Sequence, residues 1–236
     1  MFTSGAIGSM QRASSTQQTQ QTQQTLQGKP THAELTQASR DIIHEVKNML
    51  PNGAGNTSTP KAPQGIVRKL IDQVRKDSDI FDDSTLNGVI QSAYLAVAAK
   101  SGNCGENAMI AFSQAFRKGI FPIEIFYYPR GQGDHAFAVF GREPDDPGNS
   151  PGVICDPWGN YTGDFNDIVK FEQTLWTYPG PSGTPTQLIR VDRFFSDPET
   201  HYRNVTEKLD GSDIMDMSFA EGDERPGLGP DPMDIG

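Results

Sequence analysis

The chain has 236 residues, which is enough for one domain of moderate size with additional terminal segments. Hydrophobic residues make up 35% of the sequence and the mean hydropathy is −0.55, so we expect part of the chain to lie outside the folded core. The net charge of −10 argues against nucleic acid or an anionic membrane surface as the main partner. No apolar run reaches the roughly 18 residues that a membrane span needs.

The sequence contains two cysteines, Cys104 and Cys155. Two thiols are too few for a disulfide scaffold or for a cysteine-rich zinc site. We therefore predict a reducing compartment, no metal and no other cofactor. The N-terminus lacks the apolar core of roughly 7–15 residues that a Sec-type signal peptide needs, so we expect no signal of that kind.

Both ends of the chain are polar. Residues 1–31 are rich in Ser, Thr and Gln, which predicts a disordered segment before a folded domain over residues 32–200. This segment is either a plain spacer or an export signal, since its composition resembles that of bacterial type III secreted effectors. That resemblance implies delivery into the host cytoplasm and a secretion chaperone as a partner. Residues 207–236 hold nine acidic and two basic residues, which indicates an acidic tail over 201–236.

Within the predicted domain, the hydrophobic period changes from helical to alternating. Apolar residues at helical spacing predict helices over 32–50, 66–74, 84–99 and 104–118, the third with Ser84 as a possible N-cap. Short β-branched and aromatic runs then predict strands over 121–129, 135–141, 153–156 and 188–195, with a short helix over 166–176. The sequence therefore predicts an α+β fold in which a helical N-terminal part packs on an antiparallel sheet.

Cys104 lies at the start of a predicted helix, directly after the helix-breaking residues SGN (101–103). Such a cysteine is either a packing residue or a nucleophile, because the positive end of a helix favours the thiolate. His135 begins one predicted strand, 31 residues after Cys104, and Asp156 ends the next strand, 21 residues further on. Adjacent strands would set His135 beside Asp156, and a helix crossing the sheet would bring Cys104 to the imidazole.

This arrangement suits nucleophilic catalysis, because a nearby histidine can take the thiol proton and a carboxylate can orient the imidazole. Each member also has a plainer interpretation. His135 could be a surface residue at the end of a strand, and Asp156 before proline could stabilise a turn. We expect Cys155 to pack in the core on the opposite sheet face from Asp156. Glu106 and Asn107 occupy a first helical turn, where such residues are favoured in any case.

Three motifs in chain order, GNCGENA (102–108), DHAFAV (134–139) and CDPW (155–158), resemble the transglutaminase-like superfamily. Its members include animal transglutaminases, peptide:N-glycanases and several bacterial deamidase and protease effectors. The resemblance covers roughly residues 85–160 and implies a papain-like core. It further implies that Cys104 is the nucleophile, His135 the general base and acid, and Asp156 the orienting carboxylate.

The sequence also departs from that family. It has neither the paired Cys-x-x-Cys zinc motifs of peptide:N-glycanases nor room for the β-sandwich domains and calcium sites of tissue transglutaminases. The family's second oxyanion donor has no clear equivalent, and the candidates are Gln91 and, after it, Asn103. Trp158 and Tyr161 could line a pocket beside the site, or they could belong to the core.

From these observations we predict a cysteine-dependent amide hydrolase that acts on a host protein through a thioester. The small domain favours deamidation of a glutamine side chain over the other reactions that the same residues support, which are proteolysis and transglutamination. The competing hypothesis is a non-catalytic interaction module built on the same fold.

Overall fold

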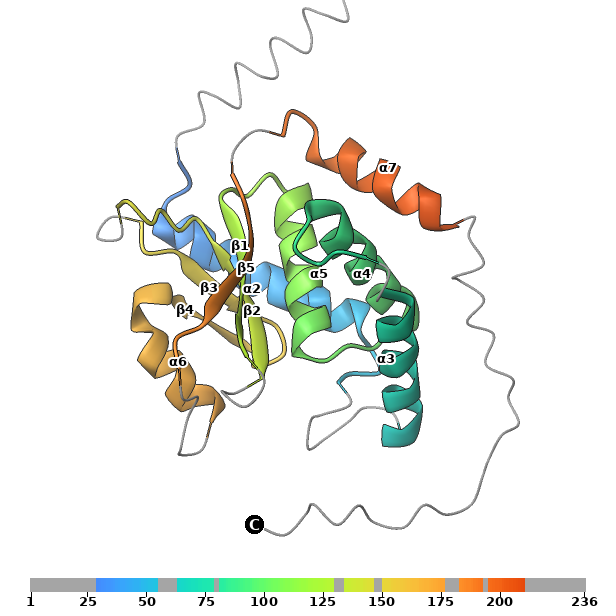
Figure 1. Ribbon diagram of the computed structural model, residues 1–236. Helices are drawn as coiled ribbons and strands as arrows, with labels where there is room; N and C mark the ends of the chain where they lie inside the picture. The colour runs from blue at the N-terminus through green and yellow to red at the C-terminus, as the bar shows by residue number, and fades with distance from the viewer. Residues whose placement is uncertain are drawn as a thin grey trace, which may run out of the picture.

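The computed structural model describes residues 29–54, 63–78, 81–129, 134–146, 150–176, 183–192 and 195–210 (Figure 1). The helices are α2 (His32–Met49), α3 (Gln64–Ser78), α4 (Leu86–Ala99), α5 (Cys104–Arg117), α6 (Ile168–Leu175) and α7 (Pro198–Asp210), with a short 3-10 helix η1 (Phe165–Asp167). The strands are β1 (Ile123–Tyr128), β2 (His135–Phe140), β3 (Val153–Asp156), β4 (Tyr161–Asp164) and β5 (Thr186–Val191). The predicted α+β class is confirmed.

The strands form one antiparallel sheet in the order β4-β3-β2-β1-β5. The first four strands follow one another as a meander, and β5 returns to the free side of β1. Three of the four predicted strands fall within two residues of their predicted bounds, and the last begins and ends earlier, at Thr186 and Val191. β4 was not predicted, because Tyr-Thr-Gly-Asp is too short and too polar to stand out from a loop.

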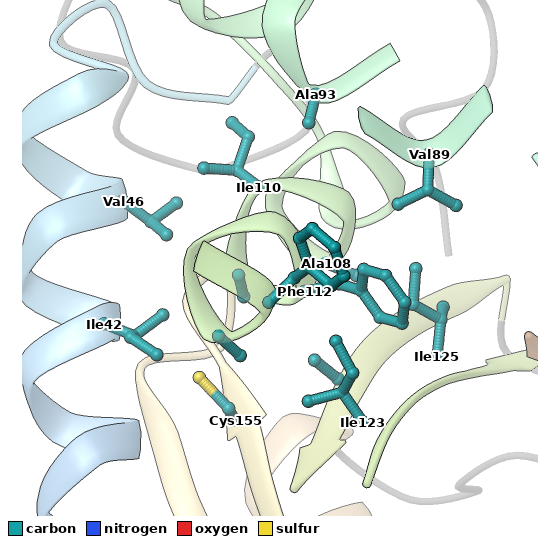
Figure 2. Close-up of a cluster of buried hydrophobic side chains, with 14 of the residues drawn as sticks. Ile42, Val46, Val89, Ala93, Ala108, Ile110, Phe112, Ile123, Ile125 and Cys155 are labelled. Carbon is teal, nitrogen blue, oxygen red and sulfur yellow. The ribbon is translucent and has the colours of Figure 1, made fainter. Parts of the chain in front are cut away.

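One face of the sheet carries a mainly aliphatic core, and α5 lies across it between the sheet and α4 (Figure 1). Helix α2 packs along the same layer, against β3 and α5. Figure 2 shows Ile42 and Val46 of α2 pointing toward α5, with Ile123 and Ile125 of β1 approaching from the sheet. α5 is therefore buried along most of its length, which fixes the position of its first residue.

The opposite face carries a smaller and mainly aromatic cluster beneath α6. Its buried members are Phe126, Tyr128, Phe137, Val139, Ile154 and Phe171. The Tyr128 hydroxyl donates a 2.5 Å hydrogen bond to Glu172, which joins α6 to the end of β1. Because side chains alternate along a strand, His135 and Asp156 share this face, while Cys155 points to the other.

Two sequence predictions need correction. The cap of α4 is Thr85 rather than Ser84: the Thr85 hydroxyl accepts a 3.1 Å hydrogen bond from the Gly88 amide. The folded domain also extends past residue 200, since α7 packs on α4 and α5 and buries Val205 and Leu209. Its polar composition concealed this helix. The predicted N-terminal segment falls almost entirely outside the described residues, as does the acidic tail after Asp210.

Candidate active site

Cys104 is the first residue of α5, and hydrogen bonds hold the loop before it. Asn103 precedes it in an extended conformation, and its amide donates to Glu106 Oε2 at 2.7 Å. The Asn107 side-chain amide donates to the carbonyl oxygens of Gly102 (2.9 Å) and Asn103 (2.8 Å). Glu106 and Asn107 therefore stabilise the turn at the start of α5 that positions the Cys104 thiol.

His135 and Asp156 meet across β2 and β3. Val139 pairs with Ile154, and continuing the same register places Asp156 opposite Phe137, one step diagonally from His135. His135 Nε2 lies 2.9 Å from Asp156 Oδ2. His135 is 4% exposed and Asp156 is fully buried, so water weakens this interaction little.

Asp156 also stabilises the turn that follows it, as the plainer interpretation of this residue predicted. Its second oxygen, Oδ1, accepts a 3.0 Å hydrogen bond from the Gly159 amide. A Cβ atom at Gly159 would lie 2.3 Å from Asp156 Oδ2 and 2.3 Å from Leu175 of α6. The turn, the carboxylate and α6 are thus packed so closely that only glycine fits between them.

The thiol approaches the imidazole at the start of β2. Asp156 occupies Nε2 of His135, which leaves Nδ1 for the hydrogen bond with Cys104. As a thiol, Cys104 also donates to the carbonyl oxygen of Asp134 at 3.6 Å. Burial lowers the pKa of His135, but hydrogen bonds to Asp156 and Cys104, together with their charges, raise it to about 9. The imidazole is therefore a cation at neutral pH, held between two groups that can carry negative charge.

Aromatic rings enclose the imidazole on the α6 side. The ring centroid of His135 lies 5.1 Å from that of Trp158, 5.6 Å from Trp176 and 6.0 Å from Phe171. The structure places the predicted pocket residue Trp158 beside His135. It places Tyr161 one ring further away, 5.0 Å from Phe171.

Sequence reasoning missed Phe171 and Trp176. The available signal was that both aromatic residues lie within the predicted helix over 166–176, whose apolar side is expected to pack on a face of the sheet.

The two oxyanion candidates lie in different places. Gln91 lies in the middle of α4, eight residues before its last residue, or about 12 Å along the helix axis. Asn103 adjoins the nucleophile, and its backbone amide is engaged by Glu106. The first amides of a helix have no acceptor within the helix. The Cys104 backbone amide is therefore well placed to donate to the oxyanion that would form when the Cys104 sulfur attacks a carbonyl carbon.

Cys155 has a different environment. It is fully buried, its side chain points toward α5 (Figure 2), and its Sγ donates to the Ser39 carbonyl at 3.6 Å. Burial raises the pKa of this thiol, a hydrogen bond from it to Ser39 opposes the shift, and the nearby charge of Asp156 adds to it. The side chain is a packing residue on the sheet face opposite Asp156, as the alternation in β3 predicted.

The sequence matches no protein-family model and no curated protein. In the part of the chain that the structure describes, no group of three or more His, Cys, Asp or Glu side chains is arranged to hold a metal ion. In that same part, no helix is both long and apolar enough to cross a membrane.

Proposed function

We propose that the protein is a cysteine-dependent amide hydrolase of the transglutaminase-like kind. Cys104 is the nucleophile, His135 the general base and acid, and Asp156 the carboxylate that orients the imidazole. One observation carries this proposal: a buried imidazole is hydrogen-bonded on one side to a carboxylate and on the other to a thiol that begins a buried helix.

The first half of the reaction is acyl transfer to sulfur. The Cys104 thiolate attacks the carbon of a carboxamide, and the Cys104 backbone amide donates to the resulting oxyanion. The imidazolium then gives its Nδ1 proton to the leaving nitrogen, the C–N bond breaks, and ammonia departs. A thioester remains on Cys104 and His135 is neutral.

The second half returns the enzyme to its starting state. Neutral His135 takes a proton from water, and the hydroxide attacks the thioester carbon. The second oxyanion collapses with loss of the Cys104 thiolate and releases a carboxylic acid, which gives its own proton to solvent. The proton stays on His135, where Asp156 stabilises the cation.

The substrate that we propose is the side-chain amide of a glutamine on a host protein, which the reaction converts to glutamate. A glutamine side chain is unbranched and narrow, and it can reach a partly exposed thiol without unfolding of the protein that carries it. The Ser/Thr/Gln-rich N-terminal segment supports delivery into a host cell. Hydrolysis of a peptide bond and transfer to an amine use the same steps and are alternative outcomes of the test below.

The test is to incubate the full chain with glutamine-containing peptides, quench in acid and measure intact masses. Deamidation predicts ammonia release, a one-dalton gain in the peptide, and an acyl adduct on Cys104 that equals the peptide less ammonia. Cleaved peptide would identify a protease, and incorporation of added methylamine a transglutaminase. Cys104→Ala and His135→Ala are the matched controls. If the wild-type protein is folded and none of the amide substrates gives an acyl adduct on Cys104, the non-catalytic interaction module becomes the better account.

A further inference from the structure

A partly buried ion pair lies beside the proposed nucleophile. Arg75 of α3 donates from Nε to Glu106 Oε1 at 2.9 Å, and the other oxygen of Glu106 accepts the Asn103 amide at 2.7 Å. Glu106 is two residues after Cys104 in the first turn of α5. A hydrogen-bonded chain therefore runs from the surface of α3 to the residue that precedes the nucleophile.

Glu106 has two opposed effects at this position. A carboxylate in the first turn stabilises the helix and closes its N-terminal loop. The same negative charge disfavours a second anion nearby, and a thiolate on Cys104 is such an anion. The Glu106 side chain is only 9% exposed, so water screens its charge poorly. The loop that presents Cys104 thus depends on a charge that opposes the thiolate.

Arg75 supplies the compensating charge. Its side chain is 52% exposed, so the cation keeps much of its hydration while its Nε–H group reaches Glu106. Partial burial lowers the pKa of the Arg75 guanidinium, and the hydrogen bond and charge of Glu106, followed by the charges of Cys104 and Asp72, more than offset this and raise it. The ion pair therefore holds the guanidinium at the first turn of α5, the turn that Cys104 begins.

We propose that Arg75 is a positioning residue for the Cys104 nucleophile: it neutralises Glu106, so that the start of α5 keeps its capping carboxylate and still favours a thiolate. This inference rests on the proposed function. Of the other charged groups nearby, Asp72 of α3 acts on Arg75, and His135 of β2 interacts with the thiol. His135 is already paired with Asp156 of β3, and the cation that pairs with Glu106 is Arg75.

The test is a charge cycle on the full chain, using Arg75→Gln, Glu106→Gln, the double variant and Arg75→Lys. The readout is the rate of Cys104 alkylation by iodoacetamide as a function of pH, with the modified residue identified by peptide mass mapping. Glutamine at position 106 can still accept the Asn103 amide, so the cap is retained. A thermal melt of each variant verifies folding.

We expect Arg75→Gln to slow alkylation at neutral pH about tenfold and to move the pH profile upward by about one unit, since an unpaired carboxylate then faces the thiolate. The double variant should return close to the wild-type profile, and Arg75→Lys should lie between the two. A purely structural role would lower the melting temperature without moving the pH profile. If Arg75→Gln fails to fold, the comparison of the double variant and Arg75→Lys with wild type decides.

The inference is overturned if a folded Arg75→Gln variant keeps the wild-type profile, or if the double variant is as slow as Arg75→Gln. If Arg75→Gln does not fold, two other results overturn the inference. One is an Arg75→Lys variant that keeps the wild-type pH profile, and the other is a double variant whose profile departs from that of wild type. Failure of the proposed function looks different, because Cys104 alkylation would then be insensitive to His135→Ala. Reactivity that depends on His135 but not on Arg75 removes only this inference.

Discussion

The two cysteines lie in regions of the same core that differ in one essential respect. Cys155 is enclosed by side chains between the sheet and α5, and its nearest polar partner is a backbone carbonyl. Cys104 lies at the N-terminal end of α5 and beside the first residue of β2, an imidazole that is a cation at neutral pH. The chemistry available to a thiol in this fold is decided by its access to a helix end and a positive charge.

The largest effect is expected from removing Asp156, the carboxylate that pairs with the imidazole beside Cys104. Asp156→Ala leaves His135 and the Gly159 amide without their acceptor inside the protein. We expect the free energy of unfolding to fall by about 3–5 kcal/mol, as for other broken buried pairs. Urea denaturation measures this. Asp156→Asn is the control, since its amide oxygen can still accept from one of the two groups, and a loss as large as that of Asp156→Ala would contradict the account.

Gly159→Ala tests the packing that holds the carboxylate in place. The new methyl group would meet Asp156 Oδ2 and Leu175, so the turn or α6 must shift. We expect a loss of about 1–3 kcal/mol in stability together with slower Cys104 alkylation. Gly65→Ala is the matched control, because a Cβ atom there has no neighbour within 4 Å. Equal behaviour of the two variants would show that the Gly159 contact does not matter.

The charge on His135 predicts a pH dependence of stability. Its pKa is raised from 6.5 to about 9 in the folded protein, so its stabilising contribution is complete below pH 6.5 and is lost as the pH rises through 9. We expect the stability difference between wild type and His135→Gln, from urea denaturation, to shrink steadily from pH 6.5 to pH 9. A difference that stays constant over this range would mean that the imidazole is neutral when buried.

The smallest effect is expected at the other cysteine. Cys155→Ala removes one sulfur atom from a packed site that has no role in the proposed reaction, so we expect a loss of about 1 kcal/mol and an unchanged rate of Cys104 alkylation. Denaturation and alkylation of the same sample provide both values. A marked change in Cys104 reactivity would instead couple the two regions through α5.

The sequence carried enough information to locate the Cys104, His135 and Asp156 side chains, because each lies at the end of an element with a clear hydrophobic period. Strand alternation also put Cys155 on the face opposite Asp156, as the structure has it. Helix α7 was missed because its buried face consists of few apolar residues, among them Val205 and Leu209, within a polar stretch.

Contacts between elements distant in sequence could not be predicted. Nothing local to Arg75 indicates that it pairs with Glu106, 31 residues later, and nothing local to Trp176 indicates that it packs on His135. Both contacts depend on how α3 and α6 dock on the central layer. Gln91 illustrates the same limit, since its distance from the start of α5 follows from the course of α4.

The most direct test of the central claim is the rate of iodoacetamide alkylation against pH for wild type, His135→Ala and Cys155→Ser, with mass mapping of the modified thiol. The account predicts that Cys104 reacts rapidly well below pH 8, that His135→Ala lowers the rate at pH 6.5 by about 100-fold, and that Cys155→Ser leaves it unchanged. A Cys104 that is inert, or that titrates as an ordinary thiol whether or not His135 is present, would contradict the proposed catalytic role.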